Sequence, residues 1–126
     1  MWTCTCSTHL LWRKMSMERL VVEGLAKSIG VSNFGVADLQ QFLDIARLKP
    51  VVNQIEFSAF LQNQTPGIVE FSQQNNVLVD TYSSLGPVTK SEPGTLHGYL
   101  KELANTHQKT PEQVLLRWCY NVGSCP

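Results

Sequence analysis

The chain of 126 residues is predicted to adopt an α/β fold with a parallel sheet. Three observations predict this fold class. Short apolar runs alternate with helical patterns, as they do where helices connect parallel strands. The runs contain few polar residues, which is typical of strands that are covered on both faces. Each run also ends in polar side chains, and ligands of parallel α/β proteins bind at the carboxyl ends of the strands.

The predicted elements follow one another in strict alternation. A helical pattern from Met17 to about Gly24 precedes the first strand. The next helix has apolar residues at spacings of three and four, and Lys49-Pro50 ends it. Thr65-Pro66 offers an N-cap hydroxyl and a first-turn proline to the helix after that. The predicted strands are 28–31, 51–55 and 77–81, and the predicted later helices are 36–47, 66–74, 96–105 and one that begins at 110–111.

Three further segments complete the organisation of the chain. The apolar residues of 1–16 recur with no clear helical or strand period, so we expect a divergent leader ahead of a single domain over 17–126. The segment 85–94 is rich in Gly, Pro and Ser, which predicts a loop. Thr110 and Gln113 have the spacing of a capping box at the start of the last helix. The apolar face of that helix consists of Val114, Leu115, Trp118 and Cys119.

Composition excludes several classes of function. The 10 Lys and Arg balance the 10 Asp and Glu and are scattered, so neither nucleic acid nor a membrane surface is expected as a partner. The longest apolar stretches have strand length, well below the roughly 18 residues of a membrane span. The first residues lack the pattern of a secretory signal, and we therefore expect a cytoplasmic protein.

Cysteine and histidine usage predicts neither disulfides nor a metal site. The cysteines lie near the two ends of the chain without the spacing of a zinc or dithiol motif, so free thiols are expected. The histidines lie far apart and form no pair at ligand spacing. These residues are Cys4, Cys6, Cys119, Cys125, His9, His97 and His107.

Amide, hydroxyl and aromatic groups gather at the strand ends. The groups are Ser32, Asn33, Gln54, Tyr82 and Ser83. An amide offers a donor and an acceptor, and a tyrosine offers a flat face, so the set suits a neutral polar ligand better than acid/base chemistry. The sequence contains no Gly-rich phosphate loop and no G-x-S-x-G elbow.

A purely structural interpretation of the same residues remains open. Asn33 and Asn53 could only cap or turn the chain at strand ends, and Tyr82 could be a core aromatic with its hydroxyl at the rim. For any single residue, a structural role is more common in proteins than a ligand-binding role. Three strands that end alike favour a ligand site for the group as a whole.

Four motifs in this order resemble signatures of the aldo-keto reductases. The match spans about 17–118, and the segment 57–67 is similar to fungal members that reduce α-keto amides and related carbonyls. The motifs are KSIGVSNF at 27–34, KPVVNQIE at 49–56, YSSLG at 82–86 and TPEQVLLRW at 110–118.

The resemblance implies a partial (β/α)8 barrel with about three of the parallel strands and their flanking helices, and NADPH as cofactor. It implies that Tyr82 stacks on the nicotinamide ring and that a carbonyl compound is the substrate of the whole family member. It assigns Ser32, Asn33 and Gln54 to the nicotinamide carboxamide, and Ser83, Leu85 and Gly86 to the ribose and pyrophosphate.

The chain also departs from the family pattern. The catalytic tetrad of Asp, Tyr, Lys and His belongs to the first half of the barrel, which has no counterpart here, so no catalytic residue is assigned. The segment that grips the 2′-phosphate should follow Trp118, but the chain stops at Pro126. Ser84 replaces a usual proline, and Ser58-Ala59 replaces a usual His-Pro; we expect both changes to affect local shape more than chemistry.

Three hypotheses follow for the chain as a whole. The first is an oxidoreductase by descent that is inactive as this fragment. The second is a non-enzymatic remnant, either an interaction module or a weak dinucleotide binder, which would self-associate through open sheet edges because Ile29, Val52 and Leu78 are left partly uncovered. The third is a truncated or misassembled gene, which would explain both ends of the chain.

Overall fold

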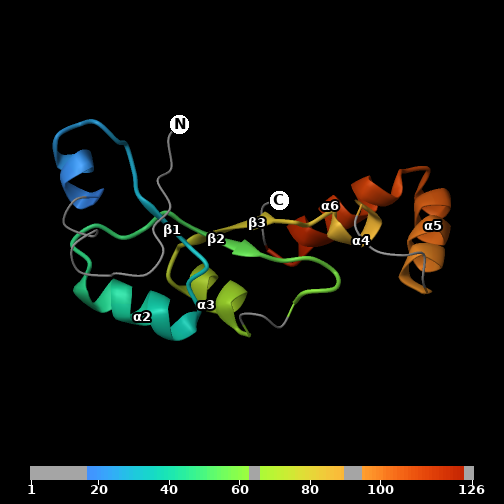
Figure 1. Ribbon diagram of the computed structural model, residues 1–126, viewed down its shortest axis with the longest axis horizontal. Coiled ribbons are helices and arrows are strands. Elements are labelled where there is room, and N and C mark those ends of the chain that lie inside the picture. The colour runs from blue at the N-terminus through green and yellow to red at the C-terminus, as the bar shows by residue number, and fades with distance from the viewer. Residues whose placement is uncertain (1–16, 63–65, 90–94, 124–126) are drawn as a thin grey trace.

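The structure is a computed structural model that describes residues 17–62, 66–89 and 95–123. Its centre is a parallel sheet in the order β1-β2-β3 (Figure 1). The strands are β1 (Gly30–Ser32), β2 (Val52–Glu56) and β3 (Leu78–Tyr82). The predicted sheet is therefore confirmed, with each strand ending one residue later than the sequence pattern indicates.

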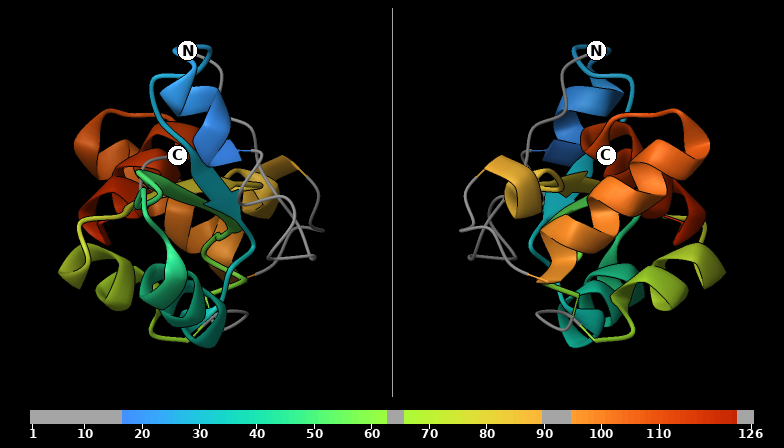
Figure 2. Two further views of the ribbon diagram at one scale, coloured as in Figure 1. Left: turned by 90° about the vertical axis from the view of Figure 1, so that its left-hand side faces the viewer. Right: turned by 90° about the vertical axis from the view of Figure 1, so that its right-hand side faces the viewer.

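Helices follow the strands in the predicted alternation. In Figures 1 and 2, α2 and α3 lie side by side beneath the sheet, whereas α5 lies at the end of the elongated molecule away from α2. Residues 17–22 are also helical, and Gly24 follows them with a φ of +73°. The other helices are α2 (Val36–Ile45), α3 (Ile68–Gln74), α4 (Gly86–Thr89), α5 (Thr95–His107) and α6 (Pro111–Asn121).

Two predicted helix boundaries are wrong for local backbone reasons. The helix after β2 begins at Ile68, because Gly67 at the N-cap has a φ of +75° and takes Pro66 out of the helical path. Thr65, the expected N-cap, lies outside the described residues. The preceding helix ends at Ile45, because Ala46 is already extended.

The segment expected to be a loop contains one helical turn. In α4 the Leu85 carbonyl accepts hydrogen bonds from Val88 N at 3.0 Å and Thr89 N at 3.1 Å. Pro87 suits the first turn of a helix, where its missing N–H needs no partner. The Gly, Pro and Ser content of this segment concealed the turn, and residues 90–94 lie outside the described part of the chain.

The core lies between the sheet and the helices. One face of the sheet buries Val31, Ile55 and Val79 against residues of α2, α3 and α6 such as Leu39, Ile68 and Cys119. On the opposite face Val52 is half-buried and Leu78 is 69% exposed, as predicted. Ile29 corrects the prediction: it is only 4% exposed, since strand alternation places it on the same face as Val31.

Gly30 permits the close approach of β1 to β2. A Cβ at this position would lie 2.6 Å from Val52 Cγ1 and 3.2 Å from the Val52 carbonyl oxygen. We expect Gly30→Ala to lower the free energy of unfolding by about 1–3 kcal/mol, measured by urea titration, because β1 must shift away from β2. The matched control is Gly98→Ala in α5, where a Cβ meets nothing within 4 Å and alanine favours the helix. Equal effects of the two substitutions would contradict the packing argument.

The start of α6 agrees with the sequence. Thr110 Oγ1 accepts from Gln113 N at 3.3 Å, and Gln113 Oε1 accepts from Thr110 N at 3.0 Å, which completes the capping box. A hydrogen bond from the Thr110 side chain lowers the pKa of the Glu112 carboxyl in the same turn. On the apolar face, Trp118 stacks on Phe57 at 5.5 Å between ring centroids. These contacts hold α6 beside the end of β2.

The structure describes Cys119, His97 and His107 among the cysteines and histidines of the chain. Cys119 is buried and forms no disulfide with a described residue, His97 is half-buried and His107 is exposed. Among the described residues, no group of three or more His, Cys, Asp or Glu side chains could hold a metal ion. Within the same ranges, no helix has both the length and the apolar character needed to cross a membrane. Cys4, Cys6, Cys125 and His9 lie outside the described residues.

Candidate functional site

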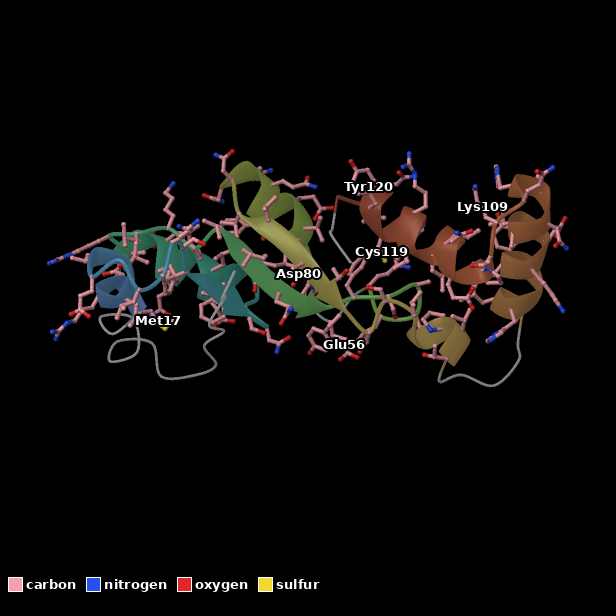
Figure 3. The ribbon with its side chains drawn as sticks, turned by 90° about the horizontal axis from the view of Figure 1, so that it is seen from above. Met17, Glu56, Asp80, Lys109, Cys119 and Tyr120 are labelled. Atoms are coloured by element: carbon pink, nitrogen blue, oxygen red, sulfur yellow. The ribbon has the colours of Figure 1, made fainter. Side chains whose placement is uncertain are left out.

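The carboxyl ends of the three strands bring the predicted polar groups together. Parallel register places Ser32 of β1 opposite Gln54 of β2, and Gln54 opposite Asp80 of β3. Tyr82 lies one step further along the same face, opposite Glu56. Figure 3 shows the strands from above and labels Asp80 and Glu56.

Hydrogen bonds connect the polar side chains across the strands. Gln54 Nε2 donates to Asp80 Oδ2 at 2.7 Å, and the Tyr82 hydroxyl donates to Asn33 Oδ1 at 3.1 Å. Ser32 Oγ donates to the Gln54 carbonyl oxygen at 3.1 Å. The four predicted residues from the three strands therefore form one continuous cluster, to which the structure adds Asp80.

This hydrogen bonding leaves an amide donor and an amide acceptor of the cluster available. Within the described part of the chain, Asn33 Nδ2 and Gln54 Oε1 have no hydrogen-bond partner. Asn33 is exposed and Gln54 is half-buried. Tyr82 is 39% exposed, which rules out a core aromatic and leaves its ring accessible. The cluster can therefore bind a planar ligand whose polar substituent contains both an acceptor and a donor.

Asn53 has the structural role that the sequence left open. It is completely buried, accepts from Phe34 N at 3.3 Å and donates to the Phe34 carbonyl oxygen at 2.9 Å. These bonds hold the turn in which Asn33 adopts a left-handed φ of +57° and donates its N–H to the Gln54 carbonyl at 2.8 Å. Asn53 thus positions Asn33 from the helix-facing side of the sheet.

The other predicted ligand contacts lie on the segment between β3 and α4. Ser83 has a φ of +60°, and its carbonyl accepts from Gly86 N at 2.9 Å. Ser83, Leu85 and Gly86 are half-buried. They follow Tyr82 directly in the chain, but no described contact joins their side chains to Asn33 or Gln54. Their ligand-binding roles stay predictions.

Ser84 fills the position of the usual proline with a buried hydroxyl. Ser84 Oγ lies 3.0 Å from Thr81 Oγ1, and a hydrogen bond also joins it to Cys119. Burial raises the pKa of the Cys119 thiol, while that hydrogen bond partly opposes the shift. Through these hydrogen bonds Ser84 links the end of β3 to Cys119 of α6.

Asp80 is the site residue that the sequence analysis missed. Strand alternation places it on the same face as Tyr82, and a half-buried carboxylate on that face needs a polar partner. The apolar residues of 77–81 dominate the strand pattern and conceal this signal. Two cavities of about 650 and 780 Å³ lie among α4, α5 and α6, and no predicted site residue lines either of them.

Comparison with known proteins identifies the family of this chain. The model of the aldo/keto reductase family matches residues 5–125. The chain is 51% identical over 116 residues to the NADPH-dependent alpha-keto amide reductase of Saccharomyces cerevisiae, which covers 87% of this chain and 36% of that protein. It is 39% identical over 132 residues to the NAD(P)H-dependent D-xylose reductase xyl1 of Hypocrea jecorina, which covers 97% of this chain and 40% of the relative.

Solved structures give the same result for the fold. An aldo-keto reductase of Bombyx mori in complex with NADP superposes with a TM-score of 0.71 at 30% identity, over 87% of this chain and 38% of that one. An aldo/keto reductase of Brucella melitensis superposes with a TM-score of 0.72 at 33% identity, over 90% of this chain and 40% of that one. The chain thus spans 36–40% of the length of these relatives and forms part of a (β/α)8 barrel. The predicted resemblance, including that to a fungal α-keto amide reductase, is confirmed: the chain belongs to the aldo/keto reductase family.

Proposed function

We propose that this chain supplies the nicotinamide-binding part of an NADPH-dependent reductase of aldehydes and ketones. The observation that carries the proposal is the donor and acceptor left available by Asn33 and Gln54 beside the accessible ring of Tyr82. The names of the relatives, which include NADPH- and NAD(P)H-dependent reductases, support the same cofactor class.

The residues present fit the nicotinamide group. Its carboxamide contains a carbonyl acceptor and an amino donor, which match Asn33 Nδ2 and Gln54 Oε1. Ser32 Oγ, which donates to the Gln54 carbonyl, keeps lone pairs that can accept from the same amino group. Tyr82 offers its ring for stacking on the nicotinamide, and Ser83, Leu85 and Gly86 extend toward the ribose and pyrophosphate. When bound, NADPH supplies the hydride.

The proposal assigns no proton donor to this chain. Carbonyl reduction needs an acid that protonates the developing alkoxide, and general acid catalysis contributes about 10²- to 10⁴-fold to such reactions. The catalytic tetrad and the 2′-phosphate clamp belong to other parts of the family barrel. Purified chain is therefore expected to bind the nicotinamide half of the cofactor without reducing carbonyl compounds.

The test compares the two halves of the cofactor. Intrinsic fluorescence is titrated with nicotinamide mononucleotide and, in parallel, with adenosine 2′,5′-bisphosphate, while NADPH absorbance is followed with an aldehyde present. We expect saturable binding of nicotinamide mononucleotide alone and no aldehyde-dependent loss of NADPH. Binding of the adenosine bisphosphate alone would overturn the assignment of the site. Reduction of the aldehyde by the purified chain would overturn the claim that this chain supplies no proton donor.

Self-association is a second candidate function, favoured by the exposure of Leu78. This side chain is 69% exposed at the start of the edge strand β3, beside half-buried Val52 on the same sheet face. A second copy of the chain is the occupant we expect here, because among the described residues β3 pairs on one side only and can offer its unpaired backbone groups to another copy.

A charge at Leu78 should weaken this association. We expect Leu78→Lys to shift the chain toward the monomer in sedimentation velocity over a range of concentrations, because a charge at a sheet edge opposes pairing between copies. Leu116→Lys on α6, also partly exposed and apolar but away from the sheet face, serves as the matched control. A monomeric parent chain, or equal effects of both variants, would remove self-association as a function of this face.

A further inference from the structure

We propose that Asp80 is a positioning residue that fixes the amide orientation of Gln54 and so makes the site selective for a carboxamide. Selection would operate against ring substituents that lack an N–H. This inference deepens the proposed function and rests on it. Asp80 itself would not touch the cofactor; it would act through Gln54.

The geometry of the pair fixes the amide in one direction. Asp80 and Gln54 are direct register partners on adjacent strands, and Gln54 Nε2 lies 2.7 Å from Asp80 Oδ2. This distance is at the short end for hydrogen bonds and is typical of bonds to a carboxylate. An ionised carboxylate can only accept, so the amino group of Gln54 must face Asp80. Gln54 Oε1 must then point the other way, as an acceptor.

Neighbouring groups leave the pair undisturbed. Among the described residues, the ion pair that the structure contains is Arg19–Glu23, remote from the sheet, and no Lys, Arg or His pairs with Asp80. The backbone of Gln54 is also held, since its carbonyl accepts from Ser32 Oγ at 3.1 Å and from Asn33 N at 2.8 Å. With its base fixed by β1 and its tip fixed by β3, the side chain has little freedom to turn over.

The second amide of the site lacks such an anchor. Asn33 bonds to the Tyr82 hydroxyl, which can donate or accept and therefore tolerates either orientation of the Asn33 amide. Asn33 can adapt to a ligand, whereas Gln54 presents an acceptor whatever the ligand is. A substituent that offers no N–H would leave Oε1 of the half-buried Gln54 without a partner in the complex, and an unmade hydrogen bond at a half-buried amide lowers affinity.

The experiment compares two dinucleotides that differ in one group. NADP⁺ has a carboxamide on the pyridine ring, and its 3-acetylpyridine analogue has a methyl ketone that lacks the N–H. Dissociation constants of both are measured for the full chain by fluorescence titration. We expect the parent chain to prefer NADP⁺ by about 3- to 10-fold, the range of one net hydrogen bond. In Asp80→Asn the preference should fall to within about 2-fold, because an amide partner can donate or accept.

A double-mutant cycle separates positioning from a general structural effect. Gln54→Ala should lower the preference at least as far as Asp80→Asn does, and adding Asp80→Asn to it should change nothing further. Glu56→Gln is the matched control: it removes a half-buried carboxylate from the same face, where no described bond joins it to Gln54, and should keep the parental preference. A preference that persists in Asp80→Asn would overturn the role of Asp80 alone. Failure of the parent chain to bind either dinucleotide would overturn the proposed function as well.

A measurement on the unsubstituted chain covers the case in which Asp80→Asn does not fold. In nitrogen-15 spectra, the two protons of the Gln54 side-chain amide should differ more in chemical shift, and one should exchange more slowly with water, than those of an exposed amide, as expected of an N–H held on a carboxylate. The exposed side-chain amide of Gln41 on α2 supplies the reference. Coincident behaviour of the two amides would overturn the proposed positioning.

Discussion

Asn53→Ala is expected to lower the free energy of unfolding by about 2–4 kcal/mol, because the Phe34 N–H and carbonyl would lose their partners. The side chain is completely buried and makes both bonds to Phe34, at 3.3 and 2.9 Å. Since the same bonds hold the turn that presents Asn33, affinity for nicotinamide mononucleotide should fall in parallel. Urea titration followed by circular dichroism measures the first effect, and fluorescence titration below the transition measures the second.

The control for Asn53 is an asparagine outside the core. Asn105→Ala removes an exposed amide from α5 and should change stability by no more than about 0.5 kcal/mol. If Asn53→Ala were as mild as this control, the buried bonds to Phe34 would not be what holds the turn after β1. If stability fell but ligand affinity did not, Asn53 would stabilise the fold without positioning the site.

Tyr82→Ala is expected to weaken binding of nicotinamide mononucleotide by about 10- to 100-fold, since stacking of a planar ring on an aromatic side chain contributes about 1–3 kcal/mol. Because the ring is 39% exposed, stability should change far less than affinity. Tyr82→Phe keeps the ring and loses the bond to Asn33, so it should retain most of the affinity. Fluorescence or NMR titration of the three proteins gives the comparison.

Tyr99→Ala is the matched control for the loss of a partly exposed ring. Tyr99 is 59% exposed on α5, away from the strand ends, and its removal should leave nicotinamide affinity unchanged. Equal losses in Tyr82→Ala and Tyr99→Ala would indicate a general effect on folding. An unchanged affinity in Tyr82→Ala would exclude stacking on this ring.

The sequence predicted the convergence of the site because few local rules determine it. Strand alternation and parallel order suffice to bring Ser32, Gln54 and Tyr82 to one edge of the sheet. Asn53 shows the limit of this reasoning. Both of its possible roles fit the same strand end, and only the bonds to Phe34 decide between them.

The features that were missed depend on the three-dimensional environment. The left-handed turn at Gly67 displaces a helix start that Thr65-Pro66 predicts, and α4 forms inside a segment whose composition indicates a loop. The role of Asp80 depends on its pairing with Gln54 across the sheet, which the pattern of a single strand does not show. Short-range signals therefore predict the helices and strands, whereas the hydrogen bond between Gln54 and Asp80 depends on pairing between strands.

The most direct test of the nicotinamide site is a chemical-shift map. Uniformly nitrogen-15-labelled chain is titrated with nicotinamide mononucleotide, and the backbone amides that shift are assigned. We expect the shifts to gather at 32–34, 54–56 and 82–86, where β1, β2 and β3 end. Shifts confined to the 780 Å³ cavity between α5 and α6, lined by residues such as His107 and Arg117, would contradict it.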